Sequence, residues 1–307
     1  MPVETQMLSK FNALIKSYGK VISLLLVMIC GAALPQFQSL SFLVQYLLMG
    51  MLFFAFLDID FNPKNFQKSI LWVLFANLAI AFLSYWLLSF FDKVLALAAF
   101  ITAIAPTAIS SPVIISFIEG QVEYVAASVL ITNICIALVV PFALPVLAQT
   151  STPVSAWQVL QPVLITMFVP LVLARGVAHL PPSPQRMIRS GKRYSFALWL
   201  FNLFIICAKA ADFMRTENSG SFGMLLKIGL VSLAICIINF ALGALIGGQR
   251  YWQESSQALG QKNNTFVIWL ALTFLNPLIA MGPTFYVLYH NLYNSWQIYL
   301  FEKRRIG

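Results

Sequence analysis

The chain of 307 residues is 60% hydrophobic and only 9% charged, whereas soluble domains carry roughly a quarter charged residues. This composition excludes an ordinary soluble domain and indicates an integral membrane protein. The formal net charge is +9, but the basic residues fall at the ends of apolar segments, so we expect no nucleic-acid partner. The four cysteines lie inside apolar segments without metal-ligand spacing, so we expect no metal site and no cofactor.

Apolar runs along the chain predict about ten transmembrane helices, because about 20 mostly apolar residues cross a bilayer. In chain order they cover residues 20–35, 40–57, 68–91, 94–118, 122–148, 157–180, 193–213, 222–247, 254–275 and 278–301. The predicted fold is therefore all-α and integral to the membrane, with one transmembrane domain over residues 1–307. When both termini are placed in the cytoplasm, most lysines and arginines fall on the cytoplasmic side of the membrane. We therefore expect both termini to be cytoplasmic, in the inner (plasma) membrane of a bacterium.

The segment from Pro181 to Arg193 (PPSPQRMIRSGKR) concentrates basic residues between the sixth and seventh predicted helices. Its prolines and serines predict the longest polar connection of the chain. The cluster is first of all a topology signal, and contact with anionic lipids is the alternative.

The fourth predicted helix contains Pro106 and Pro112, with Thr107, Ser110 and Ser111 between them. Each proline removes a backbone donor and clashes with the preceding helical turn. Lipid offers no partner for the freed carbonyl groups, so such a break must face protein or a water-filled cavity.

The ninth predicted helix carries five successive polar residues, Gln261, Lys262, Asn263, Asn264 and Thr265, in the middle of a span. A lysine inside the bilayer costs roughly 2.5–3.5 kcal/mol on insertion scales, and no acidic residue is its neighbour in sequence. The two breaks occupy the fourth helix of each half, which predicts inverted repeats over residues 16–150 and 155–303. Paired interruptions of this kind are typical of the binding site of a secondary transporter.

Both interrupted segments resemble the bile acid:sodium symporter superfamily, which also includes arsenite permeases. The resemblance rests on Ala105–Val113 running into Ile118–Gly120, on Ala258–Asn264, and on Pro283–Phe285 with His290 and Asn291 near the C-terminus. It implies a core domain with two crossing broken helices, a panel domain that moves against it, and alternating access for a bile-acid-like or carboxylate-type organic anion.

The chain departs from the sodium-coupled members of that superfamily at the residues that would bind sodium. Ala258 stands where the resemblance implies a glutamate, and Asn77 and Lys262 stand where it implies two glutamines. Val125 and Val129 replace hydroxyl residues on the fifth helix. We therefore hypothesise that the Lys262 ammonium replaces a sodium ion, attracts the substrate or carries a coupling proton; the alternative is that it only caps free carbonyl groups.

If the alignment with the family is shifted by one helical turn, Ser128, Thr132 and Asn133 of the fifth helix lie beside Ser110 and Ser111 instead. That alignment leaves open a weak monovalent-cation site. The candidate binding residues are therefore Asn77, Pro106, Thr107, Ser110, Ser111, Pro112, Thr132, Asn133, Gln261, Lys262, Asn263 and Asn264. His290 is expected to be a packing residue, and the aromatic residues Phe54 and Trp199 are expected to face lipid or the core.

The expected partners are a small organic anion and the lipid bilayer. Two alternatives to a transporter of organic anions are an arsenite-type permease and a receptor or scaffold that binds without transport. The fourth helix lacks the cysteine that the arsenite permeases use, which disfavours the first. No motif of a membrane-embedded enzyme occurs in the sequence, so we expect no enzymatic activity.

Overall fold

The computed structural model describes residue 19 and residues 22–57, 66–148, 155–216 and 222–306, and within these ranges the chain is helical without any strand. A helix over Ile22–Ala33 comes first. The other elements are η1 (Pro35–Phe42), α2 (Leu43–Phe56), α3 (Lys68–Ser89), α4 (Lys93–Ile104), α5 (Ser111–Phe117), α6 (Val122–Ala148), α7 (Ala156–Val177), α8 (Pro182–Ser190), η3 (Gly191–Tyr194), α9 (Ser195–Thr216), α10 (Phe222–Gly260), α11 (Asn264–Phe274) and α12 (Pro277–Ile306).

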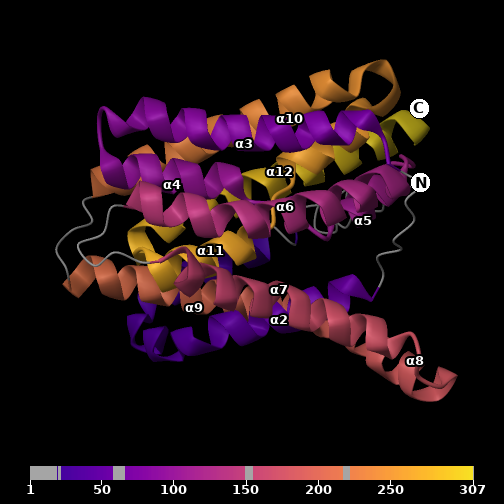
Figure 1. The fold of residues 1–307 in the computed structure, drawn as a ribbon, viewed down its shortest axis with the longest axis horizontal. Helices are drawn as coiled ribbons and strands as arrows, with labels where there is room; N and C mark the ends of the chain where they lie inside the picture. Colours follow the sequence, from indigo (N-terminus) through magenta and orange to yellow (C-terminus); the bar gives the residue numbers. More distant parts are fainter. Residues whose placement is uncertain (1–18, 20–21, 58–65, 149–154, 217–221, 307) are drawn as a thin grey trace, which may run out of the picture.

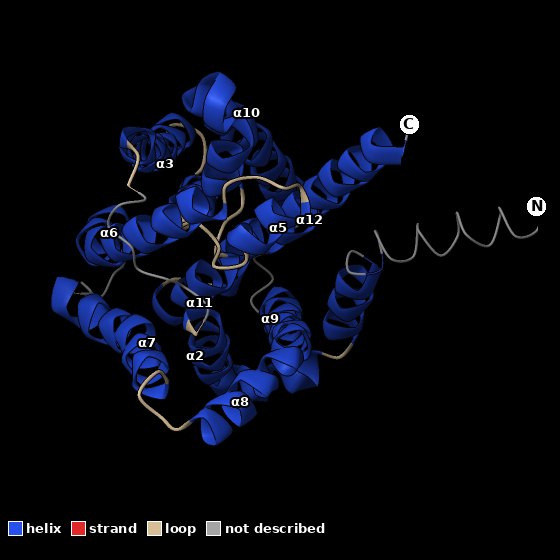
Figure 2. Ribbon diagram, turned by 90° about the vertical axis from the view of Figure 1, so that its right-hand side faces the viewer, coloured by secondary structure: helices blue, strands red, loops and turns tan. Residues whose placement is uncertain are grey.

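The helices form two groups that lie side by side along their length (Figures 1 and 2). One group holds α3, α4, α5, α6, α10 and α12, and the other holds α2, α7, α8 and α9. Within the first group α3 packs on α4, and α12 packs on both α4 and α10. In the second group α2 packs on α7 and on α9. The short helix α11 lies between the groups and contacts α12, α4 and α2.

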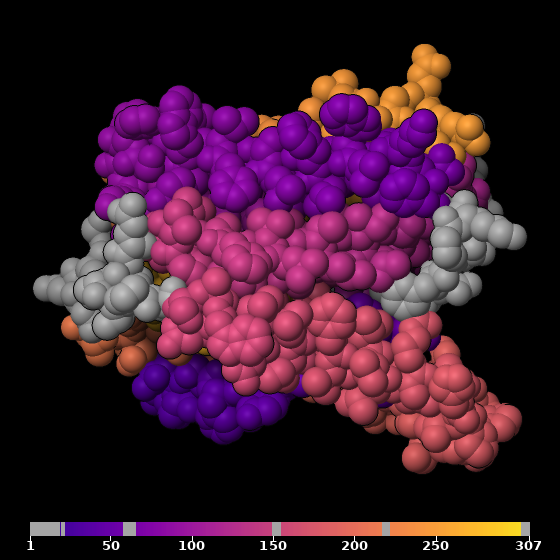
Figure 3. Space-filling model, in the orientation of Figure 1, coloured from indigo at the N-terminus to yellow at the C-terminus, as the bar shows by residue number. Residues whose placement is uncertain are grey.

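Six helical segments of the described chain are long and apolar enough to cross a membrane. Figure 3 shows α3, α6 and α7 next to one another on one face of the molecule, and each of these helices exposes large apolar side chains. Trp72 and Phe75 on α3, and Val172 on α7, are each more than half exposed. A soluble protein rarely exposes so continuous an apolar surface, whereas a lipid-embedded helix bundle requires one. These features confirm the prediction of an all-α protein compatible with a membrane.

The predicted interruptions are present, with slightly different limits. The first break runs from Ala105 to Ser110, so Pro112 lies inside α5 rather than in the break. The second covers only residues 261–263, because α11 begins at Asn264. The long helix α10 bends where two spans were predicted to be separate: Gly248 has φ +57°, and Tyr251 also departs from helical geometry.

The polar connection predicted at Pro181–Arg193 is itself largely helical, a feature that was not predicted from the sequence. Residues Pro182–Ser190 form α8, and Gly191–Tyr194 form the 3-10 turn η3 that leads into α9. Pro182 and Pro184 do not oppose this helix, because the first turn leaves backbone donors unused.

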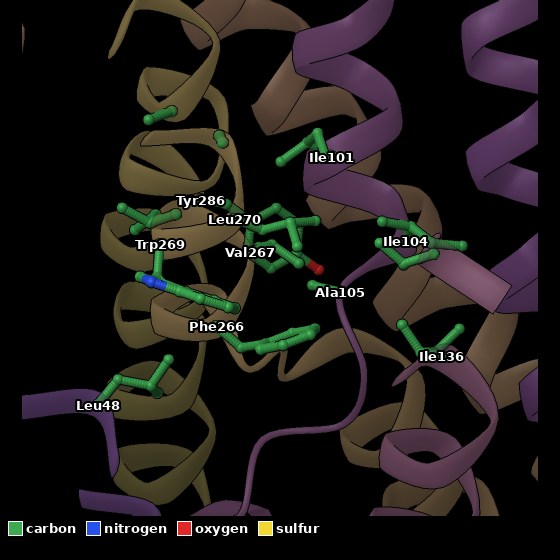
Figure 4. Close-up of a cluster of buried hydrophobic side chains, with 14 of the residues drawn as sticks. Leu48, Ile101, Ile104, Ala105, Ile136, Phe266, Val267, Trp269, Leu270 and Tyr286 are labelled. Atoms are coloured by element: carbon green, nitrogen blue, oxygen red, sulfur yellow. The ribbon is translucent and has the colours of Figure 1, made fainter. Parts of the chain in front are cut away.

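The hydrophobic core surrounds the two breaks (Figure 4). Ile101 and Ile104 at the end of α4, Ala105 at the start of the first break, and Phe266, Val267 and Leu270 of α11 are all fully or almost fully buried. Apolar side chains therefore pack beside both breaks.

Candidate functional site: two crossing breaks and the cavity between the helix groups

The first break begins because Pro106 restricts the residue before it. Ala105 has ψ 132°, an extended conformation that a residue preceding proline prefers, so α4 ends at Ile104. Pro112 stands in the first turn of α5, where its missing N–H is not needed. The two prolines thus end one half-helix and start the next, and they leave Ala105–Ser110 extended or turned between them.

The second break has no proline and is defined by a cap. The Asn263 side chain accepts a hydrogen bond from the backbone N–H of Phe266 at 3.4 Å, which starts α11. At the preceding end, Gly260 terminates α10, and its carbonyl accepts a hydrogen bond from the Tyr286 hydroxyl at 2.7 Å. Side chains therefore satisfy backbone groups that an unbroken helix would satisfy by itself.

The two breaks cross and bond to each other through their backbones. The Ala108 N–H donates to the Gln261 carbonyl at 2.8 Å, and the Asn263 N–H donates to the Pro106 carbonyl at 2.8 Å. Thr107 and Lys262 stand opposite one another in this antiparallel bridge. Because the bilayer interior offers no water to pair with backbone groups, each break supplies partners that the other requires.

Thr107 joins three elements at this crossing. Its N–H donates to the Thr132 hydroxyl at 3.0 Å, and its carbonyl accepts from the Asn133 amide at 3.0 Å. Its own hydroxyl donates to the Ala258 carbonyl at 2.5 Å, at the end of α10. Thr107 thus ties α6 and α10 to the first break.

We expect Thr107→Val to destabilise the protein by about 1–3 kcal/mol, because it leaves the buried Ala258 carbonyl without its hydroxyl partner. Thermal unfolding in detergent micelles measures the effect. Thr273→Val is the matched control, since the Thr273 hydroxyl only donates to the Trp269 carbonyl within its own helix. Equal melting temperatures for the two variants would contradict the role assigned to Thr107.

The Lys262 side chain is 2% exposed and lies at the crossing. Its ammonium donates to Asn77 Oδ1 on α3. The same Asn77 amide donates to the carbonyl groups of Ile104 and Ala105, at 3.2 and 3.4 Å. Those carbonyls form the C-terminal end of α4, and Lys262 follows the C-terminal end of α10. A helix C-terminus carries partial negative charge, and the Asn77 amide links the Lys262 ammonium to that end of α4.

In the part of the chain that the structure describes, Lys262 forms no ion pair with an acidic side chain. The buried carboxylate nearest in sequence, Glu254, instead accepts a hydrogen bond from the Gln121 N–H at 2.7 Å. The hydrogen-bond partner of the Lys262 ammonium is therefore an amide oxygen rather than a carboxylate.

A cavity of about 530 Å³ lies between the two helix groups and reaches both breaks. The breaks and the first turns of α5 and α11 line it with Ser110, Pro112, Gln261, Lys262, Asn263 and Asn264. The other helices line it mainly with Leu48, Met51, Phe54, Glu123, Lys192, Phe196, Trp199, His290 and Asn291. Lys192 is exposed, so the cavity opens toward the end of the molecule that carries α8. Its volume falls within the range of small-molecule sites.

The cavity has two chemically different walls. The residues at the breaks, together with His290 and Asn291, supply hydrogen-bonding groups, whereas α2 and the start of α9 supply apolar and aromatic side chains such as Met51 and Trp199. His290 lies with Nδ1 3.4 Å from the Asn264 amide nitrogen, and its ring meets the Tyr286 ring edge to face at 5.7 Å. Such a site suits a molecule with a polar or charged group on an apolar body.

The predicted site residues fall into two layers. Ser110, Pro112 and Gln261–Asn264 line the cavity, and Gln261 Nε2 also donates to the Ser110 hydroxyl at 3.0 Å. Asn77, Pro106, Thr107, Thr132 and Asn133 lie behind that wall and hold the breaks in place. Ser111 is fully buried at the start of α5.

The alternative alignment of the fifth helix, shifted by one helical turn, agrees with the structure only in part. Thr132 and Asn133 reach the first break, but they bond to Thr107 rather than to Ser110 or Ser111. The Ser128 hydroxyl donates to the Tyr124 carbonyl at 3.0 Å, within its own helix. The valines Val125 and Val129 are buried in the hydrophobic core.

Phe54 and Trp199 were expected to face lipid or the core, and the structure places both in the cavity wall. Lys192, Glu123 and Asn291 join them there, and none of these five was among the predicted binding residues. The polarity of the breaks was visible in the sequence, but the facing wall belongs to helices of ordinary apolar composition.

A scan against models of known protein families and a search of curated proteins found no match for the chain.

Proposed function

We propose that this protein is a secondary active transporter for a small organic anion, of the bile-acid-like or carboxylate type, which works by alternating access. The observation that carries the proposal is a single cavity lined by both interrupted helices and by the facing helix group. Interrupted helices that cross near the middle of a bundle present half-helix ends to a ligand, as transporter binding sites do.

We further propose that the short helices pair across the breaks to give about ten spans in two inverted repeats. On this reading, α4 with α5, and the end of α10 with α11, each count as one interrupted span. The group of α2, α7 and α9 would then move against the group that holds the crossing. The cavity lies between the groups, so a relative movement would change the side on which it opens.

An anion is supported by the charges that reach the cavity. Lys262 and Lys192 both line it, against the one carboxylate of Glu123. The N-terminal end of α11 also reaches the cavity at Asn264 and Thr265, and a helix N-terminus favours negative charge. The facing wall of Leu48, Met51 and Trp199 supports an apolar or aromatic body on the same molecule.

For the coupling mechanism we propose that Lys262 serves as a built-in cation. Asn77 Oδ1 and the negative ends of α4 and α10 form surroundings in which a bound monovalent cation would also be stable. A permanently tethered ammonium makes an external sodium ion unnecessary at this position. A proton carried by the same side chain is the remaining means of coupling.

The test has two stages. A thermal-shift screen of anionic metabolites, with and without sodium and across pH, identifies a ligand. Uptake of that ligand into proteoliposomes then measures transport. We expect an amphipathic organic anion to raise the melting temperature and to accumulate in sodium-free buffer. Binding without flux would replace the transporter by a receptor or scaffold, and uptake that requires sodium would refute the role given to Lys262.

A further inference from the structure

The helix α9 carries three polar side chains that are seven residues apart, Ser195, Asn202 and Lys209. Seven residues make about two helical turns, so the three side chains share one side of the helix. Ser195 lines the cavity at the end of α9 next to α8, and Lys209 lies about 20 Å further along the helix, toward the opposite end of the molecule (Figure 1). We call these three residues the polar stripe of α9.

The polar stripe lies on the buried side of α9 rather than toward lipid. Ile206 and Ala210 flank it, and both belong to the hydrophobic core. Asn202 is 0% exposed, whereas Lys209 is part-buried. Neither Asn202 nor Ile206 belongs to the cavity wall. The molecule is therefore open on the α8 side of Asn202 and closed at Asn202 itself.

Two members of the stripe have polar atoms without partners. Oδ1 and Nδ2 of Asn202 are both buried without a hydrogen-bond partner, and so is the Ser195 hydroxyl. Native proteins satisfy the large majority of buried polar side-chain atoms, and an unsatisfied one costs about 1–3 kcal/mol. Packing in this conformation therefore does not explain the Asn202 amide, whereas a conformation in which water or a ligand reaches it does.

Lys209 adds a positive charge to the same side of the helix. Among the described residues it forms no ion pair, although Asp212 follows it by only three residues. A cation beside a low-dielectric wall attracts anions more strongly than one in open water. The amide of Asn202 supplies two N–H donors that suit the oxygens of an anionic group.

We propose that the polar stripe lines a second access path, which joins the cavity to the end of the molecule opposite α8 and is closed in this structure. Lys209 attracts the anionic group of the solute to this path, and Asn202 donates hydrogen bonds to it on the way to the cavity. The inference rests on the proposed transport, because only a protein that opens at both ends needs a second path.

The experiment introduces Asn202→Cys into a protein that carries Cys30→Ser and Cys135→Ser, since the other two cysteines are buried. Membrane vesicles are treated with an anionic thiol reagent, 2-sulfonatoethyl methanethiosulfonate, or with the cationic reagent that carries a trimethylammonium group instead. Mass spectrometry then measures the rate at which each reagent labels the protein.

We expect the anionic reagent to label Asn202→Cys at least about tenfold faster than the cationic reagent. Lys209→Gln should abolish this preference, and Lys227→Gln should preserve it, because Lys227 is an exposed lysine near the same end of the molecule. The matched buried control is Ser232→Cys, which should stay unlabelled: Ser232 is 1% exposed, and its hydroxyl already donates to backbone carbonyl groups.

Labelling of Asn202→Cys no faster than that of Ser232→Cys would overturn the path, and a preference that survives Lys209→Gln would overturn the role of Lys209. A second variant, Asn202→Leu, should melt at the same or a higher temperature than the unmodified protein while uptake falls. A lower melting temperature would show instead that the amide stabilises the fold. Uptake of an organic anion without labelling of Asn202→Cys would refute the path and leave the proposed function intact, whereas labelling without uptake would refute transport.

Discussion

Replacement of the buried lysine by methionine, Lys262→Met, is expected to lower anion uptake by at least about tenfold while the melting temperature stays the same or rises. Burying the ammonium costs roughly 2.5–3.5 kcal/mol. A hydrogen bond to a charged group recovers about 1.5–3 kcal/mol, and the two helix ends add about 0.3–2 kcal/mol. These contributions nearly cancel, so an apolar side chain of similar length should not weaken the fold. Proteoliposome uptake and thermal unfolding in micelles measure the two effects.

The opposite pattern would show that Lys262 only caps carbonyl groups. A cap is a stabilising element, so its removal should lower the melting temperature while uptake by the folded fraction persists. Lys227→Met is the matched control, since Lys227 is an exposed lysine on the same long helix as the second break. Its uptake should equal that of the unmodified protein.

A shorter replacement, Lys262→Ala, adds a direct test of the built-in cation. It removes the ammonium and leaves Asn77 Oδ1 and the helix ends around an empty volume. Oxygen ligands of this kind suit a hard monovalent cation. We expect uptake by Lys262→Ala to be restored in part by sodium, and uptake by the unmodified protein to be indifferent to it. Failure of both sodium and potassium to restore uptake would argue for proton transfer or direct substrate contact instead.

The sequence predicts the two breaks well because the physics of each break is local. Pro106 ends a helix through its own ring and its effect on Ala105, wherever the rest of the chain lies. Five successive polar residues in an apolar segment are equally informative, because a membrane span cannot carry them without a reason. Their partners are less visible. That Thr107 pairs with Lys262, and that Asn133 reaches the Thr107 carbonyl, depends on how distant helices pack.

The facing wall of the cavity was not predictable for the same reason. Phe54 and Trp199 belong to helices in which apolar residues occur on all sides, so composition does not distinguish a lipid-facing side chain from one that lines a cavity. For the segment around Arg186 a polar connection was predicted, but its helical conformation was not foreseen. All of its prolines fall in or before the first turn of α8, where they are compatible with a helix.

Gly260 is the most tightly packed position at the crossing. We expect Gly260→Ala to destabilise the protein by about 3 kcal/mol. A methyl group there would lie 2.3 Å from Cδ1 of Phe240. The Phe240 ring cannot move aside easily, because it stacks on Tyr293 with the ring centroids 3.9 Å apart. Gly229→Ala is the control: it lies on the same helix, is buried, and its added methyl group would meet nothing closer than 3.5 Å.

The control should leave stability unchanged or raise it by roughly 0.5–1 kcal/mol, as alanine does in a helix. If Gly260→Ala melts like Gly229→Ala, the close contact between the end of α10 and Phe240 is not required by the fold. The double variant Gly260→Ala/Phe240→Leu separates a steric effect from a backbone effect, because the smaller side chain makes room for the methyl group. Recovery of the melting temperature in that variant would show that ring contact, rather than backbone conformation, is what requires glycine beside the second break.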